Sequence, residues 1–127
     1  MKRDMLPPLA VLAVILAFAL WNSAAITERT QRWRNQLQQV EALAATENWQ
    51  AAGNTLAESY KDWSGSQVYL HIVSEHDAVD DAEAMYRRAM AFALEQESSE
   101  FRAELADLRD QLRLLAEMER FSLKNVL

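Results

Sequence analysis

The side chains best suited to chemistry are two polar positions on an otherwise apolar helical stripe, His76 and Glu83. Asp80 follows His76 by four residues, so the three side chains would share one helix face. Imidazole binds transition metals and titrates near neutral pH, and carboxylates bind divalent cations, so a metal or proton site is one interpretation. The other is structural, with His76 buried and paired with a carboxylate of Glu83 or Glu119. We favour a structural polar network of His76, Asp80, Glu83 and Glu119.

The usual motifs of catalysis and cofactor binding are missing from the sequence. His71 lies five residues before His76 and is expected on a different helix face. The sequence has no Glu-x-x-His or His-Glu-x-x-His, which removes the dimetal-bundle and zinc-protease helices, and no glycine-rich phosphate loop. Cysteine is absent, which excludes disulfides and thiolate metal sites. We therefore predict no catalytic residues, no cofactor, no metal ligands and no enzyme activity.

The composition predicts an all-α fold. The 127 residues include only two glycines and two prolines, too few for a turn-rich β architecture. Ala, Leu, Glu, Gln and Arg predominate, and these residues lose little on entering a helix. Apolar residues at alternating spacings of three and four predict an antiparallel bundle of three to four helices within residues 27–127. The predicted helices cover residues 27–45, 48–63, 67–95 and 100–120.

The predicted helices have well-defined apolar stripes. The first includes Trp33, Leu37 and Val40, and the last runs from Phe101 to Leu115 with uninterrupted spacing. The stripe of the helix 67–95 includes Tyr69, Ile72, His76, Val79, Glu83, Tyr86, Met90 and Ala93. Ser64-Gly65-Ser66 marks either a left-handed helix end at Gly65 or a kink in one longer helix.

An apolar run precedes the bundle. The 17 residues from Met5 to Trp21 carry no charge and would span about 25 Å as a helix, just short of a hydrocarbon core of about 30 Å. Small residues continue to Ile26 and close the gap. We predict that residues 1–26 form an N-terminal membrane anchor that contacts lipid through residues 5–26. The alternatives are a signal peptide cleaved after Ser23-Ala24-Ala25 and a buried helix of a soluble protein.

Charge predicts the orientation of the anchor and excludes one class of partner. Lys2 and Arg3 flank the apolar run directly, whereas the arginines from Arg29 to Arg34 begin eight residues beyond Trp21. The rule that cytoplasmic flanks are basic therefore predicts a single-pass membrane protein with an extracytoplasmic C-terminal bundle. Residues 1–26 carry a net charge of +1 and the rest of the chain carries −7, and such an acidic domain repels nucleic acid.

Several landmarks carry a resemblance to a known family. They are the N-terminal span, Trp49, Trp63, His76-Asp77 with Asp80, and the closing Glu119-x-x-Ser122-Leu123-x-Asn125-Val126-Leu127. Over nearly its whole length the chain resembles the bacterial domain-of-unknown-function family numbered 4363. The resemblance implies a membrane-anchored protein, found mainly in Gram-positive bacteria, with no established activity. Members are often encoded beside a small multi-pass membrane protein, which implies a membrane partner.

Together these features predict a non-catalytic, membrane-anchored accessory or interaction protein of the bacterial cell envelope. Its bundle would bind another membrane protein, with a multi-pass protein as the candidate. The alternative is a helical module that senses a small ligand or a cation through the polar face of the helix 67–95. An enzyme is the third hypothesis. The oligomeric state is not predicted.

Overall fold

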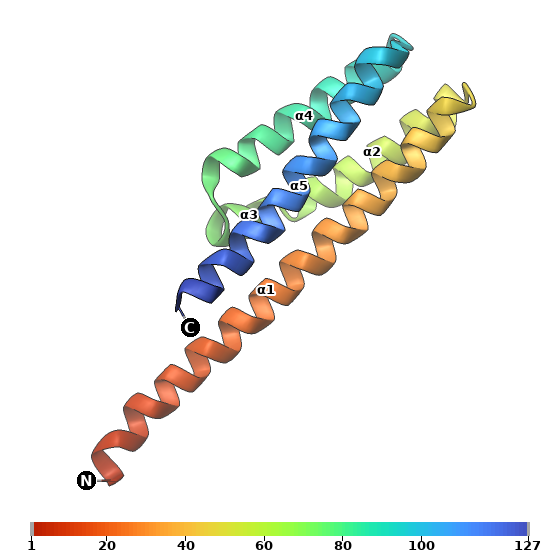
Figure 1. Ribbon diagram of the computed structural model, residues 1–127. Coiled ribbons are helices and arrows are strands. Elements are labelled where there is room, and N and C mark those ends of the chain that lie inside the picture. Colours follow the sequence, from red (N-terminus) through yellow and green to blue (C-terminus); the bar gives the residue numbers. More distant parts are fainter. Residues whose placement is uncertain (1, 127) are drawn as a thin grey trace.

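The chain forms an antiparallel helical bundle with one long helix projecting from it (Figure 1). The computed structural model describes residues 2–126, with side chains for residues 5–121, 124 and 125. No strand occurs among the described residues, which confirms the all-α prediction. The four long helices are packed as a bundle, and the short α3 connects α2 to α4. The helices are α1 (Lys2–Ala45), α2 (Trp49–Gly65), α3 (Gln67–Val73), α4 (His76–Leu94) and α5 (Ser98–Val126).

The helix α1 has an exposed half and a packed half. Its large apolar side chains from Met5 to Trp21 are mostly exposed, several of them by 55–68%. Within the described residues, α1 is the only helix long and apolar enough to cross a membrane. The core helix of a soluble protein would be covered by the rest of the chain, but this segment is not. Packing against the bundle begins at Asn22, Ser23 and Ile26, which are buried, so the last turn of the predicted anchor segment 1–26 also contacts the bundle.

The core lies where the apolar stripes predicted it. Trp33, Leu37 and Val40 on α1 are fully buried, as is the α5 stripe from Phe101 to Leu112. Burying one such large side chain contributes roughly 1.5–3 kcal/mol, so these two stripes hold the bundle together. The indole rings of Trp33 and Trp63 meet edge-on with centroids 5.2 Å apart, a favourable aromatic arrangement.

Two tight turns reverse the chain at the end of the bundle far from the N-terminus. Glu47 and Gln96 adopt left-handed backbone angles, with φ of 61° and 53°. After α1, the N–H of Asn48 donates to the carbonyl of Leu43 over 3.0 Å, which closes a Schellman-type helix end. The side chain of Asn48 then accepts the N–H of Ala51 at 3.3 Å and caps α2. These turns make the neighbouring helices antiparallel.

The segment 64–95 differs from the prediction in two ways. Gly65 is not left-handed, and Ser66 has helical angles (φ −96°, ψ −2°), so α2 passes into α3 through a kink, which was the alternative interpretation. The predicted single helix 67–95 is wrong, because Ser74 is extended (φ −122°, ψ 169°) and separates α3 from α4. Ile72 therefore leaves the predicted stripe and is 77% exposed.

Candidate functional site

The break between α3 and α4 creates the most distinctive polar cluster of the described residues. The carboxylate of Glu75 accepts the N–H of Ala78 at 2.7 Å and that of Asp77 at 3.3 Å, so it caps α4. Gln111 on α5 donates to the carbonyl of Ala78 over 3.0 Å and holds this first turn against the bundle. The start of α4 is thereby fixed, and α3 folds back beside it.

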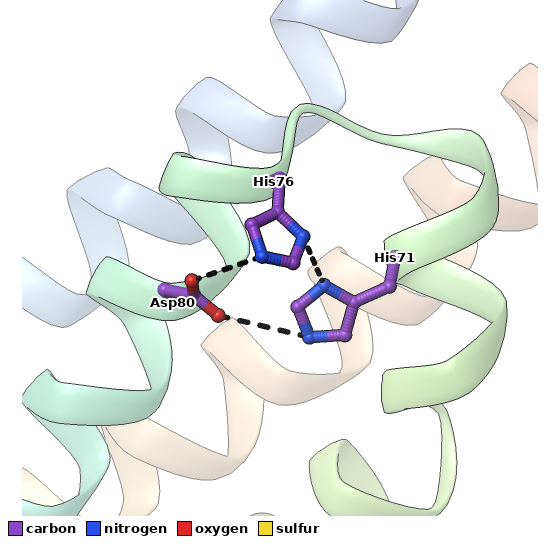
Figure 2. Close-up of side chains that lie close together, drawn as sticks. All are labelled: His71, His76 and Asp80. Carbon is purple, nitrogen blue, oxygen red and sulfur yellow. Dashed lines mark hydrogen bonds and ion pairs between the residues drawn. The ribbon is translucent and has the colours of Figure 1, made fainter.

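Two histidines and one aspartate meet at this break (Figure 2). Nδ1 of His71 on α3 lies 2.9 Å from Nδ1 of His76 on α4. Asp80, one turn along α4, has one oxygen 3.7 Å from Nε2 of His71 and the other 3.4 Å from Nε2 of His76. The side chains are 30%, 69% and 55% exposed, respectively, so the cluster is open to solvent. Within the described part of the chain, these residues form the group that could hold a metal ion.

The predicted structural network is wrong in its main feature. His76 is not a buried seam residue, because the helix break moves it to the surface. Its carboxylate neighbour is Asp80, as the four-residue spacing suggested, and neither Glu83 nor Glu119. His71 was expected on a different helix face, yet it contacts His76 directly. A separation of five residues brings two side chains together here only because the helix is interrupted between them.

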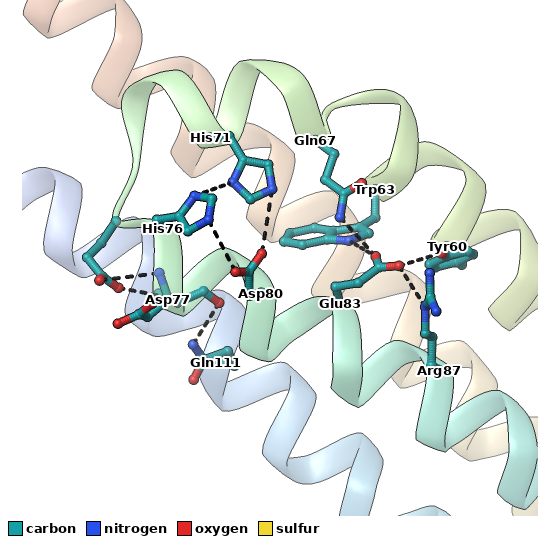
Figure 3. A network of polar contacts seen from close by, with 12 residues as sticks. Tyr60, Trp63, Gln67, His71, His76, Asp77, Asp80, Glu83, Arg87 and Gln111 are labelled. Carbon is teal, nitrogen blue, oxygen red and sulfur yellow. Dashed lines mark hydrogen bonds and ion pairs between the residues drawn. The ribbon is translucent and has the colours of Figure 1, made fainter.

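Glu83 forms the centre of a second, separate cluster (Figure 3). Its carboxylate accepts hydrogen bonds from the Tyr60 hydroxyl at 2.6 Å, the Trp63 indole at 3.0 Å and the Gln67 amide at 3.1 Å. Arg87 adds an ion pair at 2.9 Å. Burial alone would raise the pKa of Glu83, but the hydrogen bonds outweigh it and hold this pKa below its ordinary value. Glu83 thus ties the kink between α2 and α3 to α4.

Glu119 belongs to a third cluster, beside the exposed half of α1. Its carboxylate accepts a hydrogen bond from the Asn22 amide at 2.9 Å. The carbonyl oxygen of the same amide accepts the hydroxyl of Tyr69 on α3. The guanidinium of Arg29 lies over the Tyr69 ring, 4.6 Å from its centroid, a cation–π contact. Asn22 therefore joins α1, α3 and the end of α5 just where the exposed apolar segment stops.

A fourth cluster, which was not predicted from the sequence, surrounds Asp62 on α2. One of its oxygens accepts Nε of Arg32 at 2.7 Å and the indole N–H of Trp33 at 2.9 Å. Burial works to raise the pKa of Asp62, but these hydrogen bonds prevail and lower it. A buried tryptophan needs an acceptor for its N–H, so Trp33 could have signalled a partner on the next helix.

The fold and its clusters define a class of protein: a helical bundle with polar clusters at its kinks and an apolar helix that could be a membrane anchor or a signal sequence. A family model described as a domain of unknown function, DUF4363, matches residues 20–126. The chain belongs to this family, as its landmarks indicated. No curated protein and no solved structure matches the chain.

Proposed function

We propose that this chain is a non-catalytic, membrane-anchored accessory protein of the bacterial cell envelope. It holds its helical bundle at the outer face of the membrane, where the bundle binds another membrane protein. The observation that carries this proposal is the continuity of α1, in which an exposed apolar segment passes without a break into a buried core stripe. A rigid helix of this kind holds the bundle close to the bilayer and leaves no flexible linker between them.

Retention of the anchor is supported by the packing of the residues that follow it. Cleavage after Ala25 would remove Asn22, which is 95% buried and bonded to Glu119 and Tyr69. The hydrogen bonds that join α1 to α3 and α5 through Asn22 would then be lost. The family match also begins at residue 20, upstream of that cleavage position. The same segment therefore serves both as part of the bundle and as the last turn of the anchor.

The orientation rests on the charges beside the span. Lys2 and Arg3 lie immediately before it, and basic residues adjacent to a span favour the cytoplasmic side. The bundle that follows is strongly acidic and would lie outside the cell. A soluble ligand or substrate is not needed for this role, because the bundle acts through contact with its partner.

The proposed contact surface is the end of the bundle nearest the span. Val68 and Ile72 on α3 are 76% and 77% exposed, and Phe121 on α5 is 65% exposed. The Asn22 junction brings α3 and the end of α5 beside the last turn of the anchor (Figure 1). A partner that covers these apolar side chains must itself lie at the membrane surface. An integral membrane protein meets that requirement.

The test is site-specific photo-crosslinking in native membranes. A photoreactive residue is placed at Ile72 or Phe121, and the matched control is placed at Leu94, which is 86% exposed at the opposite end of the bundle. We expect the same integral membrane protein to be crosslinked from Ile72 and Phe121 and not from Leu94. The proposal is overturned if the first two positions give no protein adduct, or if Leu94 gives the same one.

A further inference from the structure

We propose that His71 and His76 bind a divalent transition-metal ion through their Nδ1 atoms, with Asp80 holding both rings in place. This inference goes beyond the proposed function and does not depend on it. The site lies at the break between α3 and α4, so the ion would tie the two helices together. Imidazole ligands suit Cu²⁺, Ni²⁺ and Zn²⁺, and we assign the site to this class of ion.

The positions of the four ring nitrogens leave room for a cation between the two Nδ1 atoms. The two Nδ1 atoms lie 2.9 Å apart, and each Nε2 faces a different oxygen of Asp80 at 3.4–3.7 Å. The Nδ1–Nδ1 contact has hydrogen-bond length, whereas the two Nε2 atoms only face the carboxylate of Asp80 at distances longer than a hydrogen bond. When each neutral ring carries its proton on the Nε2 that faces the negatively charged Asp80, the two Nδ1 lone pairs are left side by side with nothing between them. A cation at the Nδ1 pair completes the arrangement.

The geometry fits such an ion. The Nδ1 atoms of the two rings are 2.9 Å apart, and the ring centroids are 4.5 Å apart. Two imidazoles that pointed straight at each other would have more widely separated centroids, so the rings meet at an angle. Two nitrogens at bond lengths of about 2.0–2.1 Å and at a right angle around one ion are separated by roughly 2.9 Å. That separation is typical of neighbouring ligands in the square-planar or octahedral geometry of Cu²⁺ and Ni²⁺.

Asp80 has the role of the carboxylate that commonly stands behind a metal-binding histidine. Such a carboxylate accepts the N–H of the second ring nitrogen, fixes the tautomer and makes the free nitrogen a better ligand. Here the two oxygens of one carboxylate face the Nε2 atoms of the two histidines at 3.7 and 3.4 Å, close enough to tighten into such bonds when an ion is bound (Figure 2). The exposure of His76 leaves room for water to complete the coordination.

The test is Cu²⁺ binding by the full-length protein in detergent micelles, purified without a polyhistidine tag. Isothermal titration should give one ion per chain, and electron paramagnetic resonance of the bound Cu²⁺ should show nitrogen ligands. We expect His71→Ala and His76→Ala each to weaken binding at least tenfold. Asp80→Asn should weaken it by about 10- to 100-fold, the usual effect of losing such a supporting carboxylate.

The matched control is Asp81→Asn, which removes a neighbouring exposed carboxylate on the same helix. It should bind Cu²⁺ as the wild type does. All four substitutions lie at partly or fully exposed positions, and circular dichroism without metal checks that each variant is folded. The proposal is overturned if both histidine variants bind Cu²⁺ like the wild type, if no nitrogen ligand is seen, or if Asp81→Asn is as defective as the histidine variants.

Discussion

Replacing Glu83 by alanine should destabilise the bundle more than any other single carboxylate change on α4. The carboxylate accepts the indole N–H of Trp63, whose side chain is fully buried. A buried donor without an acceptor costs about 1–3 kcal/mol, and the loss of the hydrogen bonds from Tyr60 and Gln67 adds to it. The free energy of unfolding should therefore fall by about 2–4 kcal/mol.

The assay is thermal unfolding of the full-length protein in detergent, followed by circular dichroism. For a bundle of this size, about 1 kcal/mol corresponds to roughly 4 °C, so Glu83→Ala should lower the Tm by about 8–16 °C. Asp81→Ala, which removes an exposed carboxylate two residues earlier, is the control and should shift the Tm little. A Glu83→Ala variant within about 0.5 kcal/mol of the wild type would refute the reasoning, since that is the range of neutral surface substitutions.

The lowered pKa of Glu83 predicts how the stability difference between the wild type and a second variant, Glu83→Gln, depends on pH. A carboxyl group whose pKa is lower in the folded state stabilises the fold above its unfolded value of 4.5. That contribution is lost as the pH falls from 4.5 through the folded pKa. The stability difference between the wild type and Glu83→Gln should therefore be largest near pH 7 and shrink below pH 4.5. A difference that is constant between pH 3 and pH 7 would contradict the assigned role.

Substitutions at three further positions test other features of the fold by the same Tm measurement. Tyr86→Phe should lower the free energy of unfolding by about 1 kcal/mol or somewhat more, because the buried Ser59 hydroxyl loses its hydrogen-bond partner at 2.9 Å. An unchanged Tm would mean that this hydrogen bond is not formed. Asp62→Ala should lower the free energy of unfolding by about 1–3 kcal/mol, because the buried indole N–H of Trp33 loses its acceptor. Asp62→Asn keeps an acceptor oxygen and should lower it less. Gln96→Gly should raise stability by up to about 1 kcal/mol, since the left-handed φ of 53° suits glycine; a loss would refute this view of the turn.

The apolar stripes were the most predictable part of the fold. Leu105, Leu108 and Leu112 recur at spacings of three and four with no polar interruption, and all three are fully buried. Trp33 and Leu37 on α1 were predicted in the same way. Periodicity predicts these buried residues because a helix that buries one continuous face needs apolar residues at spacings of three and four along its sequence.

The candidate site could not be predicted by the same argument. The spacing from Tyr69 to Val79 is as regular as that of α5, but Ser74 and Glu75 interrupt the helix, and Ile72 and His76 leave the core. A glutamate cap is less typical than Ser, Thr, Asp or Asn, so the helix start at Glu75 was missed. The contact of His71 with His76 depends entirely on that break.

Labelling from outside the cell, combined with an alkaline wash of the membranes, tests the central claim most directly. The chain has no cysteine, so Ser98→Cys places one thiol on an exposed residue at the end of the bundle far from the anchor. We expect a membrane-impermeant maleimide to label this variant in intact cells, and the labelled full-length chain to stay in the washed membranes. Labelling only after permeabilisation, or release of a shortened chain beginning near Ile26, would contradict a retained anchor with an external bundle.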